Sequence, residues 1–544
     1  MGMKKLLLVL GVTLLMVGSN LQAQSFFTAD DHLVNGYARK LAGLDFEYMS
    51  CIPGHRSSLL LRANNGKDFV EWETDPAPVG IKQKYATFVW IAAIGSSPGR
   101  ARMDLAVNGV QQFSFYTDGR PQWQLNGNDG WVLQFNSIMT DQYGDQHGYM
   151  ILRVPSNKIT AGKPLKLRVT GSEANLTSWY MTFTKPVKTG VTLNAFPAIL
   201  KNGTKKQQLV EAAIFYFGNQ VEARIYANDK LLVTTPLKFG YNTVNLGLPP
   251  VAKPEKVKLK VVAGDFAVSN TVMLNPVRKW TVDLVQHSHT DIGYTRSQTE
   301  ILAEHLRYID YALDYCDATD TYPENAKFRW TCEASWPVDE FLKCRPASQV
   351  ERLKKRIAEG RIQVTGMYYN FDELPDEQVL AASLKAVGRI KAAGIPVSLA
   401  MQDDVNGIGW CMNDYFNQLG VKYLNMGTHG HRALICFDKP TMFWWESPSG
   451  KKLLTFRAEH YMIGNTELEI QTGDISKFKN NLFNYLLTLD AKKYPFDEMA
   501  IQHSGYLTDN SPPSTIASQL IKQWNDIFEW PKLTTAVAGT FFEH

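Results

Sequence analysis

Residues 280–293 read WTVDLVQHSHTDIG, and this stretch decides the fold of the second half of the chain. The run from Thr281 to His287 is typical of a buried strand, and polar residues follow it at alternate positions. Because side chains two apart on an extended chain point the same way, His287, His289 and Asp291 are expected to converge at the strand's end. Imidazole and carboxylate at this spacing suit zinc or a similar divalent ion. A polar loop with a capping Asp explains the same residues.

Strand, loop and helix then repeat downstream of this stretch. The expected strands are 281–287, 328–332, 361–367, 397–401, 421–424, 498–502 and 534–537, and the expected helices are 300–316, 349–358, 377–393 and 411–419. Such alternation favours parallel β/α units, whose functional groups gather at the carboxyl ends of the strands.

Two further polar motifs follow expected strands. Residues 402–407 read QDDVNG, and residues 503–510 read HSGYLTDN. Adjacent carboxylates such as Asp403 and Asp404 repel each other unless a cation or protons relieve the repulsion. A turn with a helix cap accounts for the first motif equally well, and an Asx turn accounts for the second. Their shared position after strands favours a single site built from all three motifs.

The chain before residue 279 has a different pattern. Short β-rich runs such as residues 86–93 recur between turn residues, and long helical periodicity is absent. We therefore predict a multidomain protein with a β-sandwich domain over residues 24–186 and an immunoglobulin-like β-sandwich over 187–278. An α/β catalytic domain over 279–544 follows them.

The N-terminus has the pattern of a signal peptide over residues 1–23. Lys4 and Lys5 precede an apolar run from Leu6 to Val17, and a plausible cleavage point follows Ala23. No later segment reaches the length of a membrane span. We therefore expect a secreted or periplasmic protein.

Charge and cysteine content exclude some classes of function. The formal net charge is only +4 over 544 residues, and no basic run stands out, so nucleic acid is not an expected partner. No C-x-x-C pair exists, so a cysteine zinc site is not expected, and the cysteines are interpreted mostly as buried thiols. A disulfide would be compatible with export. The cysteines are Cys51, Cys316, Cys332, Cys344, Cys411 and Cys436.

The H-x-H-x-D-x-G start at His287 resembles the opening of the catalytic domain of glycoside hydrolase family 38, the α-mannosidases. The resemblance covers roughly residues 280–544 and implies a seven-stranded β/α barrel-like domain. The other segments that carry it are Trp330-x-x-Glu333, Gly366 to Glu377, Asp404-Val405-Asn406-Gly407, Phe443-Trp444-Trp445-Glu446 and Glu459-His460-Tyr461.

This resemblance implies a zinc-assisted, retaining α-mannosidase that removes terminal mannose from mannose-containing glycans by double displacement. It makes His289, Asp291 and Asp404 the zinc ligands, with Asp404 also the nucleophile and Asp509 the acid/base. The remaining implied residues are Tyr294, Trp330, Glu333, Trp445 and Tyr461 on the substrate side, with His287 and Asp403 supporting the ligands from behind.

The sequence departs from the family pattern in three places. Tyr294 stands where the family usually has Trp, and Gly427 where it has Arg. In that family the fourth zinc ligand is a His beyond the end of this chain; no His here clearly replaces it, and His503 is a weak candidate. The chain stops at His544, one turn into an expected helix. We therefore expect a C-terminally incomplete domain that is nearly inactive alone.

Two other functions fit parts of the sequence. A non-catalytic glycan-binding protein would use the β domains, with Trp90, Trp123 or Trp131 as sugar platforms, although scattered aromatics are more often core. A metal-dependent polysaccharide deacetylase would use the Asp-Asp pair, but its two His at i and i+4 are missing. The sequence is also compatible with a homo-oligomer.

Overall fold

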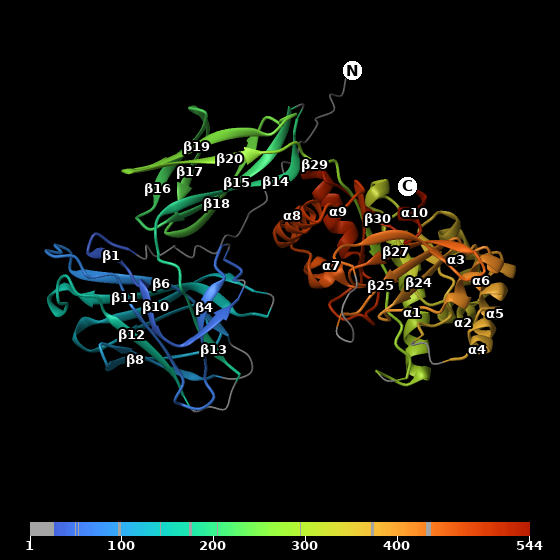
Figure 1. Ribbon diagram of the computed structural model, residues 1–544, viewed down its shortest axis with the longest axis horizontal. Coiled ribbons are helices and arrows are strands. Elements are labelled where there is room, and N and C mark those ends of the chain that lie inside the picture. The colour runs from blue at the N-terminus through green and yellow to red at the C-terminus, as the bar shows by residue number, and fades with distance from the viewer. Residues whose placement is uncertain are drawn as a thin grey trace, which may run out of the picture. The chain divides into compact units, whose positions relative to one another are not determined.

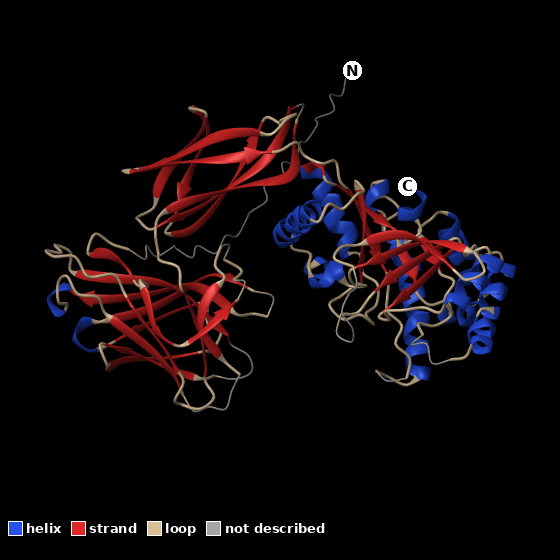
Figure 2. Cartoon of the chain, viewed as in Figure 1, coloured by secondary structure: helices blue, strands red, loops and turns tan. Residues whose placement is uncertain are grey.

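The structure is a computed structural model that divides into two compact units. Unit 1 contains the described residues up to Leu193 together with Ala212–Val244 and Val257–Val272. Unit 2 contains Asn194–Glu211, Asn245–Lys256 and Met273–His544. Strands dominate the chain up to residue 274, and helices gather after it (Figures 1 and 2). The described residues are 27–48, 50–52, 54–95, 100–141, 143–172, 177–203, 205–293, 295–371, 375–430 and 437–544. The predicted signal peptide, residues 1–23, lies outside the described residues.

Two sheets build the first β region. Their strand orders are β3-β4-β13-β6-β11-β10-β9, with β1 parallel to β6, and β2-β5-β12-β7-β8. The strands are β1 Asp31–Asn35, β2 Arg39–Ala42, β3 Leu44–Glu47, β4 Ser57–Arg62, β5 Phe69–Glu73, β6 Tyr85–Gly95, β7 Arg102–Val107, β8 Val110–Tyr116, β9 Gln122–Asn126, β10 Val132–Thr140, β11 Gln146–Pro155, β12 Lys166–Gly171 and β13 Trp179–Phe183.

Residues from both of these sheets share one hydrophobic core. The rings of Trp72 and Trp90 lie 5.6 Å apart inside it, and both side chains are fully buried. Trp123 is 8% exposed in the same core, and Trp131 packs against it. Because a sugar platform needs an open ring face, Trp90 and Trp123 are core residues rather than platforms.

The second β region has two four-stranded sheets, ordered β18-β15-β14-β29 and β17-β16-β19-β20. One member comes from far along the chain: β29, Phe528–Trp530, pairs with β14 through Ile199 and Leu200. A self-contained domain over 187–278 would lack this strand. The other strands are β14 Gly190–Asn202, β15 Lys205–Tyr216, β16 Val221–Ala227, β17 Lys230–Leu237, β18 Gly240–Leu248, β19 Glu255–Ala263 and β20 Phe266–Leu274.

Parallel strands alternate with helices after residue 280, as the pattern predicted. They fall in three sheets, β28-β21-β30, β22-β23 and β24-β25-β27-β26, in which only the β26–β27 pairing is antiparallel. The predicted seven-stranded barrel-like arrangement stays a prediction: the described pairings form three sheets, and an isolated parallel bridge between His287 and Thr331 links β21 to β22. The strands are β21 Thr281–Gln286, β22 Trp330–Cys332, β23 Ile362–Val364, β24 Leu399–Asp403, β25 Tyr423–Gly427, β26 Thr441–Glu446, β27 Lys452–Ala458, β28 Glu498–His503 and β30 Lys532–Ala536.

Capping residues mark the ends of several helices in this region. Ser297 and Glu300 form a capping box at the start of α1, and α6 ends at Gly420 with a left-handed φ of 71°. The helix expected over 377–393 is broken at Leu384 into α4 and α5. The helices are α1 Gln298–Ala318, α2 Trp336–Cys344, α3 Ala347–Ala358, α4 Glu377–Ser383, α5 Lys385–Ala392, α6 Trp410–Leu419, α7 Ile463–Thr466, α8 Ile475–Ala491, α9 Ile516–Ile527 and α10 Thr540–Glu543.

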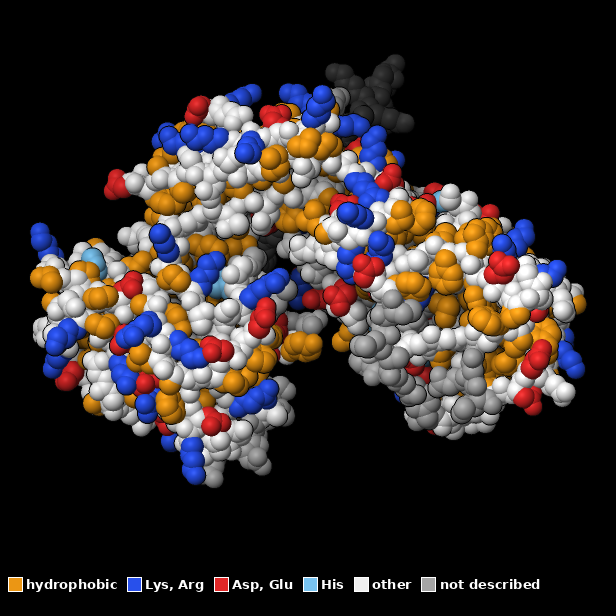
Figure 3. Space-filling model, viewed as in Figure 1, with side chains coloured by type: hydrophobic (Ala, Val, Ile, Leu, Met, Phe, Trp, Pro, Cys, Tyr) orange, Lys and Arg blue, Asp and Glu red, His pale blue; other side chains and the backbone are white. Residues whose placement is uncertain are grey.

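The charged side chains and the cysteines can be located in the structure. Acidic and basic side chains are both spread over the face drawn in Figure 3. Among the described cysteines only Cys316 and Cys332 are buried; Cys51 and Cys411 are half-buried and Cys344 is exposed, so the expectation of mostly buried thiols is wrong. Cys436 lies outside the described residues. Among the described helices, none is both long and apolar enough to cross a membrane.

Candidate active site and metal centre

The motif after β21 is held against the loop after β28 by backbone hydrogen bonds. The amide of His287 donates to the carbonyl of His503, and the amide of His289 donates to that of Asp509, both at 3.0 Å. The amide of Asp291 donates to Asn510 Oδ1 at 3.0 Å. The two motifs that the sequence placed after separate strands therefore form one rim of the site.

Glu333, directly after β22, lies between the two histidines. His287 Nδ1 is 2.6 Å from Glu333 Oε2, and His289 Nδ1 is 2.8 Å from Glu333 Oε1. Asn370 donates to the same Oε1 at 2.5 Å. Burial alone would raise the pKa of the Glu333 carboxyl, but the charges and hydrogen bonds of the two histidines hold it well below its usual range. An ionised Glu333 thus fixes the orientation of both rings.

The two histidine rings differ in whether their Nε2 atom is available to bind a ligand. His287 Nε2 lies 2.8 Å from the Tyr461 carbonyl, so both nitrogens of this ring are occupied. His289 Nε2 faces Asp291 Oδ1 at 3.3 Å and Asp404 Oδ2 at 3.8 Å. The structure therefore brings together the three predicted ligands, whose donor atoms lie within 4.8 Å of one another. His287 is hydrogen-bonded to the same Glu333 carboxylate as His289.

The two adjacent aspartates occupy different environments. Asp403 is fully buried and accepts from the Gly427 amide at 2.8 Å and from Gln502 Nε2 at 3.0 Å. Asp404 has a left-handed backbone with φ of 65°, and its side chain is 27% exposed. A non-glycine residue held there stores about 1 kcal/mol of strain or more, which is typical of functional positions. Asp404 is thus the accessible carboxylate and Asp403 the structural one.

Gly427 stands where the resemblance implies an Arg, and the structure leaves no room for a side chain there. A Cβ would lie 2.5 Å from Asp403 Oδ1 and 2.6 Å from the Cα of Tyr461. Contacts under 3 Å with backbone cannot be relieved by side-chain rotation alone. The glycine therefore allows Asp403 and Tyr461 to approach each other.

Tyr461 joins Asp509 to the rest of the site. Its hydroxyl donates to Asp509 Oδ2 at 3.0 Å, and its ring lies 4.9 Å from that of His289. Burial raises the pKa of Tyr461, and the nearby charges of Asp509 and Asp404 raise it further, so the phenol stays a donor. Asn510 Nδ2 also donates to Asp291 Oδ2 at 2.6 Å. The predicted acid/base and the predicted ligands thus share one hydrogen-bonded frame.

An open pocket of about 470 Å³ adjoins this frame. Its size suits a sugar-sized ligand, because small-molecule sites commonly have volumes of about 300 Å³ or more. Carboxylates, an amide and aromatic rings meet in its lining. Lining residues that the site uses are His289, Asp291, Tyr369, Asn370, Phe371 and Asp404.

Several residues predicted on the substrate side lie elsewhere. Trp330 is 3% exposed within a hydrophobic core, and both Glu333 oxygens are engaged in the interior. Trp445 on β26 pairs with Leu453, five residues before Ala458, which is about 16 Å along the strand from the carboxyl end. These three positions therefore offer no surface to a sugar at the site. Tyr294 lies outside the described residues.

His429 is the residue that the sequence analysis missed. It follows β25, and its Nε2 lies 3.6 Å from Asp404 Oδ1. Asn406 fixes its backbone, because the side-chain amide of Asn406 donates to the His429 carbonyl at 2.9 Å and accepts from its amide at 3.0 Å. The available signal was its position just after a parallel strand. His503 is buried, and its Nδ1 contacts the Ser504 carbonyl. Among the described residues, neither His429 nor His503 belongs to a group whose donor atoms all lie within 4.8 Å of one another.

The chemistry of this donor set fits a divalent transition-metal ion. Burial alone would lower the pKa of His289, but Glu333 and Asp291 raise it well above its usual value. The His289 ring therefore keeps a proton, whose positive charge balances the carboxylates of Glu333 and Asp291. An imidazole whose second nitrogen is bound to a carboxylate, beside two more carboxylates, is a common zinc environment. A bound ion would replace that proton.

Comparison with known proteins defines the class. Residues 279–544 match the family model described as Glycosyl hydrolases family 38 N-terminal domain. The match places this region among the glycoside hydrolases. Residues 279–544 therefore belong to family 38, as the motif resemblance predicted. No curated protein matches the chain.

Solved structures similar to the chain include two from Enterococcus faecalis. An alpha-mannosidase from strain V583 has 17% identity and a TM-score of 0.41, over 49% of this chain and 29% of that chain. A family 38 protein has 15% identity and a TM-score of 0.35, over 49% and 27%. A β-glucuronidase from Ruminococcus gnavus has 10% identity and a TM-score of 0.20, over 90% and 97%. The chain thus spans less than a third of the length of either Enterococcus protein.

Proposed function

We propose that this protein is a zinc-assisted, retaining α-mannosidase that removes terminal α-linked mannose from glycans. The observation that carries the proposal is the donor set of His289, Asp291 and Asp404, oriented by Glu333 at the edge of an open pocket. Membership of residues 279–544 in family 38 supports the hydrolase class. The mannose preference rests on the motif resemblance stated above. We also propose a β/α barrel-like arrangement for the three sheets of this region, in which all pairings except β26–β27 are parallel.

His289, Asp291 and Asp404 would hold the ion, and we propose His429 as a fourth ligand within this chain. When bound, zinc supplies Lewis-acid charge that polarises sugar hydroxyls and balances the surrounding carboxylates. His429 is favoured over a residue beyond His544 because its Nε2 already faces Asp404, and Asn406 fixes its backbone. The site would then contain two imidazoles and two carboxylates, and the near inactivity that the missing fourth ligand led us to expect would no longer follow.

The protein's own residues divide the remaining work. Asp404, exposed and conformationally strained, attacks the anomeric carbon and forms a glycosyl-enzyme. Asp509 gives a proton to the departing glycosidic oxygen, and then removes one from the attacking water. Tyr461 holds Asp509 through its hydroxyl, and Asp403 fixes the strand end behind Asp404. The carboxylate attacks from the face opposite the leaving group, and water then displaces it from the face that the leaving group vacated, so two inversions restore the starting configuration.

The decisive experiment measures hydrolysis of an aryl α-mannoside by the zinc-loaded full chain, with the product anomer followed by NMR. We expect the α-anomer first, and a loss of about 10³-fold or more in Asp404→Asn. Asp403→Asn controls for general loss of charge, and its folding is checked by circular dichroism. A β-anomer would exclude retention. Activity in the wild type no greater than in Asp404→Asn would favour a non-catalytic glycan-binding protein.

The fourth ligand has a test that does not depend on turnover. Zinc affinity of the chelator-treated chain, measured by competition with a fluorescent chelator, should fall at least about tenfold in His429→Ala. His460→Ala is the matched control, because its Nδ1 instead accepts from the Met462 amide. Equal affinities in the two variants would remove His429 from the ligand set.

We further propose that the protein is exported. The support is the basic start, apolar run and cleavage point within residues 1–23. N-terminal sequencing of the mature protein should begin at Gln24. Recovery of the intact Met1 terminus from the cytoplasm would contradict export.

A further inference from the structure

Strand β21 carries functional side chains at two levels on one face. His287 lies just past its carboxyl end, and Asp283 precedes it by four residues, about 13 Å along a strand. Because side chains alternate, the two share a face. Neighbouring β28 repeats this arrangement, with Gln502 bonded to Asp403 and Glu498 four residues before it. A second polar cluster therefore lies at the amino ends of the two strands that build the active site.

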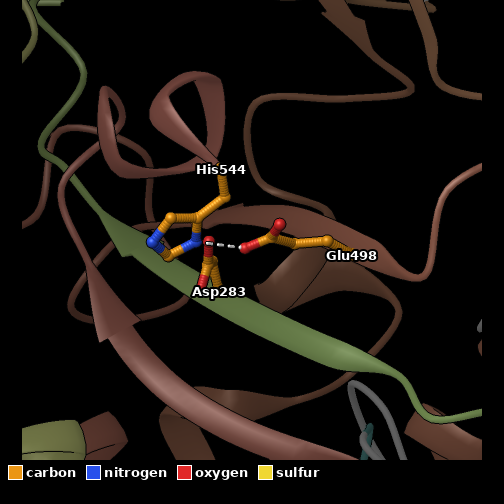
Figure 4. Close-up of side chains that lie close together, drawn as sticks. All are labelled: Asp283, Glu498 and His544. Atoms are coloured by element: carbon orange, nitrogen blue, oxygen red, sulfur yellow. Dashed lines mark hydrogen bonds and ion pairs between the residues drawn. The ribbon is translucent and has the colours of Figure 1, made fainter.

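Three side chains meet there, as Figure 4 shows. His544 Nδ1 lies 2.7 Å from Glu498 Oε1, and the donor atoms of Asp283, Glu498 and His544 all lie within 4.8 Å of one another. Asp283 is fully buried, whereas the Glu498 and His544 side chains are 21% and 56% exposed. The cluster is thus closed at the aspartate and open to solvent at the histidine.

The Asp283 carboxylate is the unusual member. Neither of its oxygens has a hydrogen-bond partner among the described residues, although the side chain points at the other two (Figure 4). A buried carboxylate without donors is strongly disfavoured unless a proton or cation neutralises it. Arg329, whose charge also acts on the pKa of Asp283, is already bound to Glu324 and Thr535.

We propose that Asp283, Glu498 and His544 bind a divalent transition-metal cation such as Zn²⁺, at a structural site distinct from the active site. Two carboxylates and one imidazole are a suitable ligand set, and the exposed side leaves room for water as a further ligand. The ion would join β21, β28 and the residue after α10. Burial and the neighbouring Glu498 raise the pKa of Asp283 to about 7.

The test counts metal ions in a background that cannot use the first site. The full chain carrying His289→Ala and Asp404→Asn is treated with chelator, loaded with Zn²⁺ at pH 8, desalted and analysed by mass spectrometry for metal content. We expect about one equivalent of zinc per chain, with a zinc-dependent rise in thermal stability. Adding His544→Ala should weaken zinc binding at least about tenfold. The matched control is Glu543→Gln, an exposed acid in the adjacent α10 position, which should leave binding unchanged.

The alternative is a carboxyl pair that shares a proton, and Asp283→Asn distinguishes it. In the same background, Asp283→Asn removes the buried charge from the metal-free protein. Under our proposal, the variant also loses the rise in thermal stability that zinc causes. Zinc binding that survives both His544→Ala and Asp283→Asn would overturn the proposal. A background protein that binds no zinc would overturn it as well. Neither result bears on the α-mannosidase proposal, because the active site is disabled throughout.

Discussion

At the scale of single residues, Glu333 determines which atoms of the two histidines remain for a ligand. Its carboxylate accepts from both Nδ1 atoms, so Nε2 of His289 faces Asp291 and Asp404. In Glu333→Gln an NH₂ group would face one imidazole N–H, so the His289 ring should lose its fixed orientation. We expect zinc affinity to fall about 10- to 100-fold, measured by chelator competition. Glu340→Gln, a partly exposed acid paired with Lys343, is the control, and equal affinity in both variants would contradict this role.

Asp509 can be tested through the leaving group. A good leaving group needs little protonation, so Asp509→Ala should hydrolyse a dinitrophenyl α-mannoside nearly as well as the wild type. With a poor leaving group, such as mannose itself, we expect a loss of about 10²- to 10⁴-fold. The measurement is kcat/KM across a series of leaving groups with increasing pKa. A uniform loss across the series would remove Asp509 from the acid role.

Gly427 is a steric requirement rather than a lost arginine. In Gly427→Ala, the new methyl group would meet the Asp403 carboxylate and the Tyr461 backbone. We expect a loss of about 1–3 kcal/mol in the free energy of unfolding, because overpacking displaces neighbours. Chemical denaturation measures this change. Gly407→Ala is the control, since a Cβ there would meet nothing within 4 Å, and an equal loss in both variants would contradict the steric explanation.

At the scale of elements, periodicity and polar motifs predicted much of the site. The strands before His287, Asp404 and Asp509 all formed, because their apolar runs are bounded by polar or turn residues. Trp445 was misplaced because β26 is antiparallel to its neighbour, so its motif lies at the far end of the sheet. The role of Glu333 required knowing that two histidines approach it from another strand. Such long-range contacts leave no local signal in a single sequence.

Strand β29 shows the same limit for the fold. It pairs with β14 across more than 300 residues, and Phe196 of β14 lies 5.1 Å from Phe483 of α8 in one core. Because Phe196 is only 8% exposed, Phe196→Ala should cost about 3–5 kcal/mol in the stability of unit 2. The control is Leu231→Ala on β17, where the side chain is 49% exposed and a small change is expected. Equal changes in denaturation midpoint would mean that β14 is not part of the unit 2 core.

At the scale of the whole molecule, the two units contain different stabilising devices. Unit 1 has a buried ion pair, in which Asp31 Oδ1 lies 2.7 Å from Arg153 Nε, with side chains 1% and 15% exposed. Burial alone would raise the pKa of Asp31, but the hydrogen bonds from Arg153 and Thr87 lower it. A depressed carboxyl pKa stabilises the fold above about pH 4 and loses that effect as pH falls further. Unit 2 contains the proposed metal ligands.

These devices should make two unfolding transitions respond to different changes. Domains with separate cores commonly unfold in separate steps, which scanning calorimetry resolves. At pH 7, Asp31→Asn should lower the free energy of unfolding of unit 1 by about 3 kcal/mol and leave unit 2 unchanged, because it removes the buried carboxylate that pairs with Arg153. The effect should shrink below about pH 4, where the wild-type carboxyl also gains a proton. Zinc should raise only the unit 2 transition, and chelator should reverse that rise, because ligands stabilise the state that binds them. If zinc and Asp31→Asn shifted the same transition, the two units would unfold together and the metal would not act on unit 2 alone.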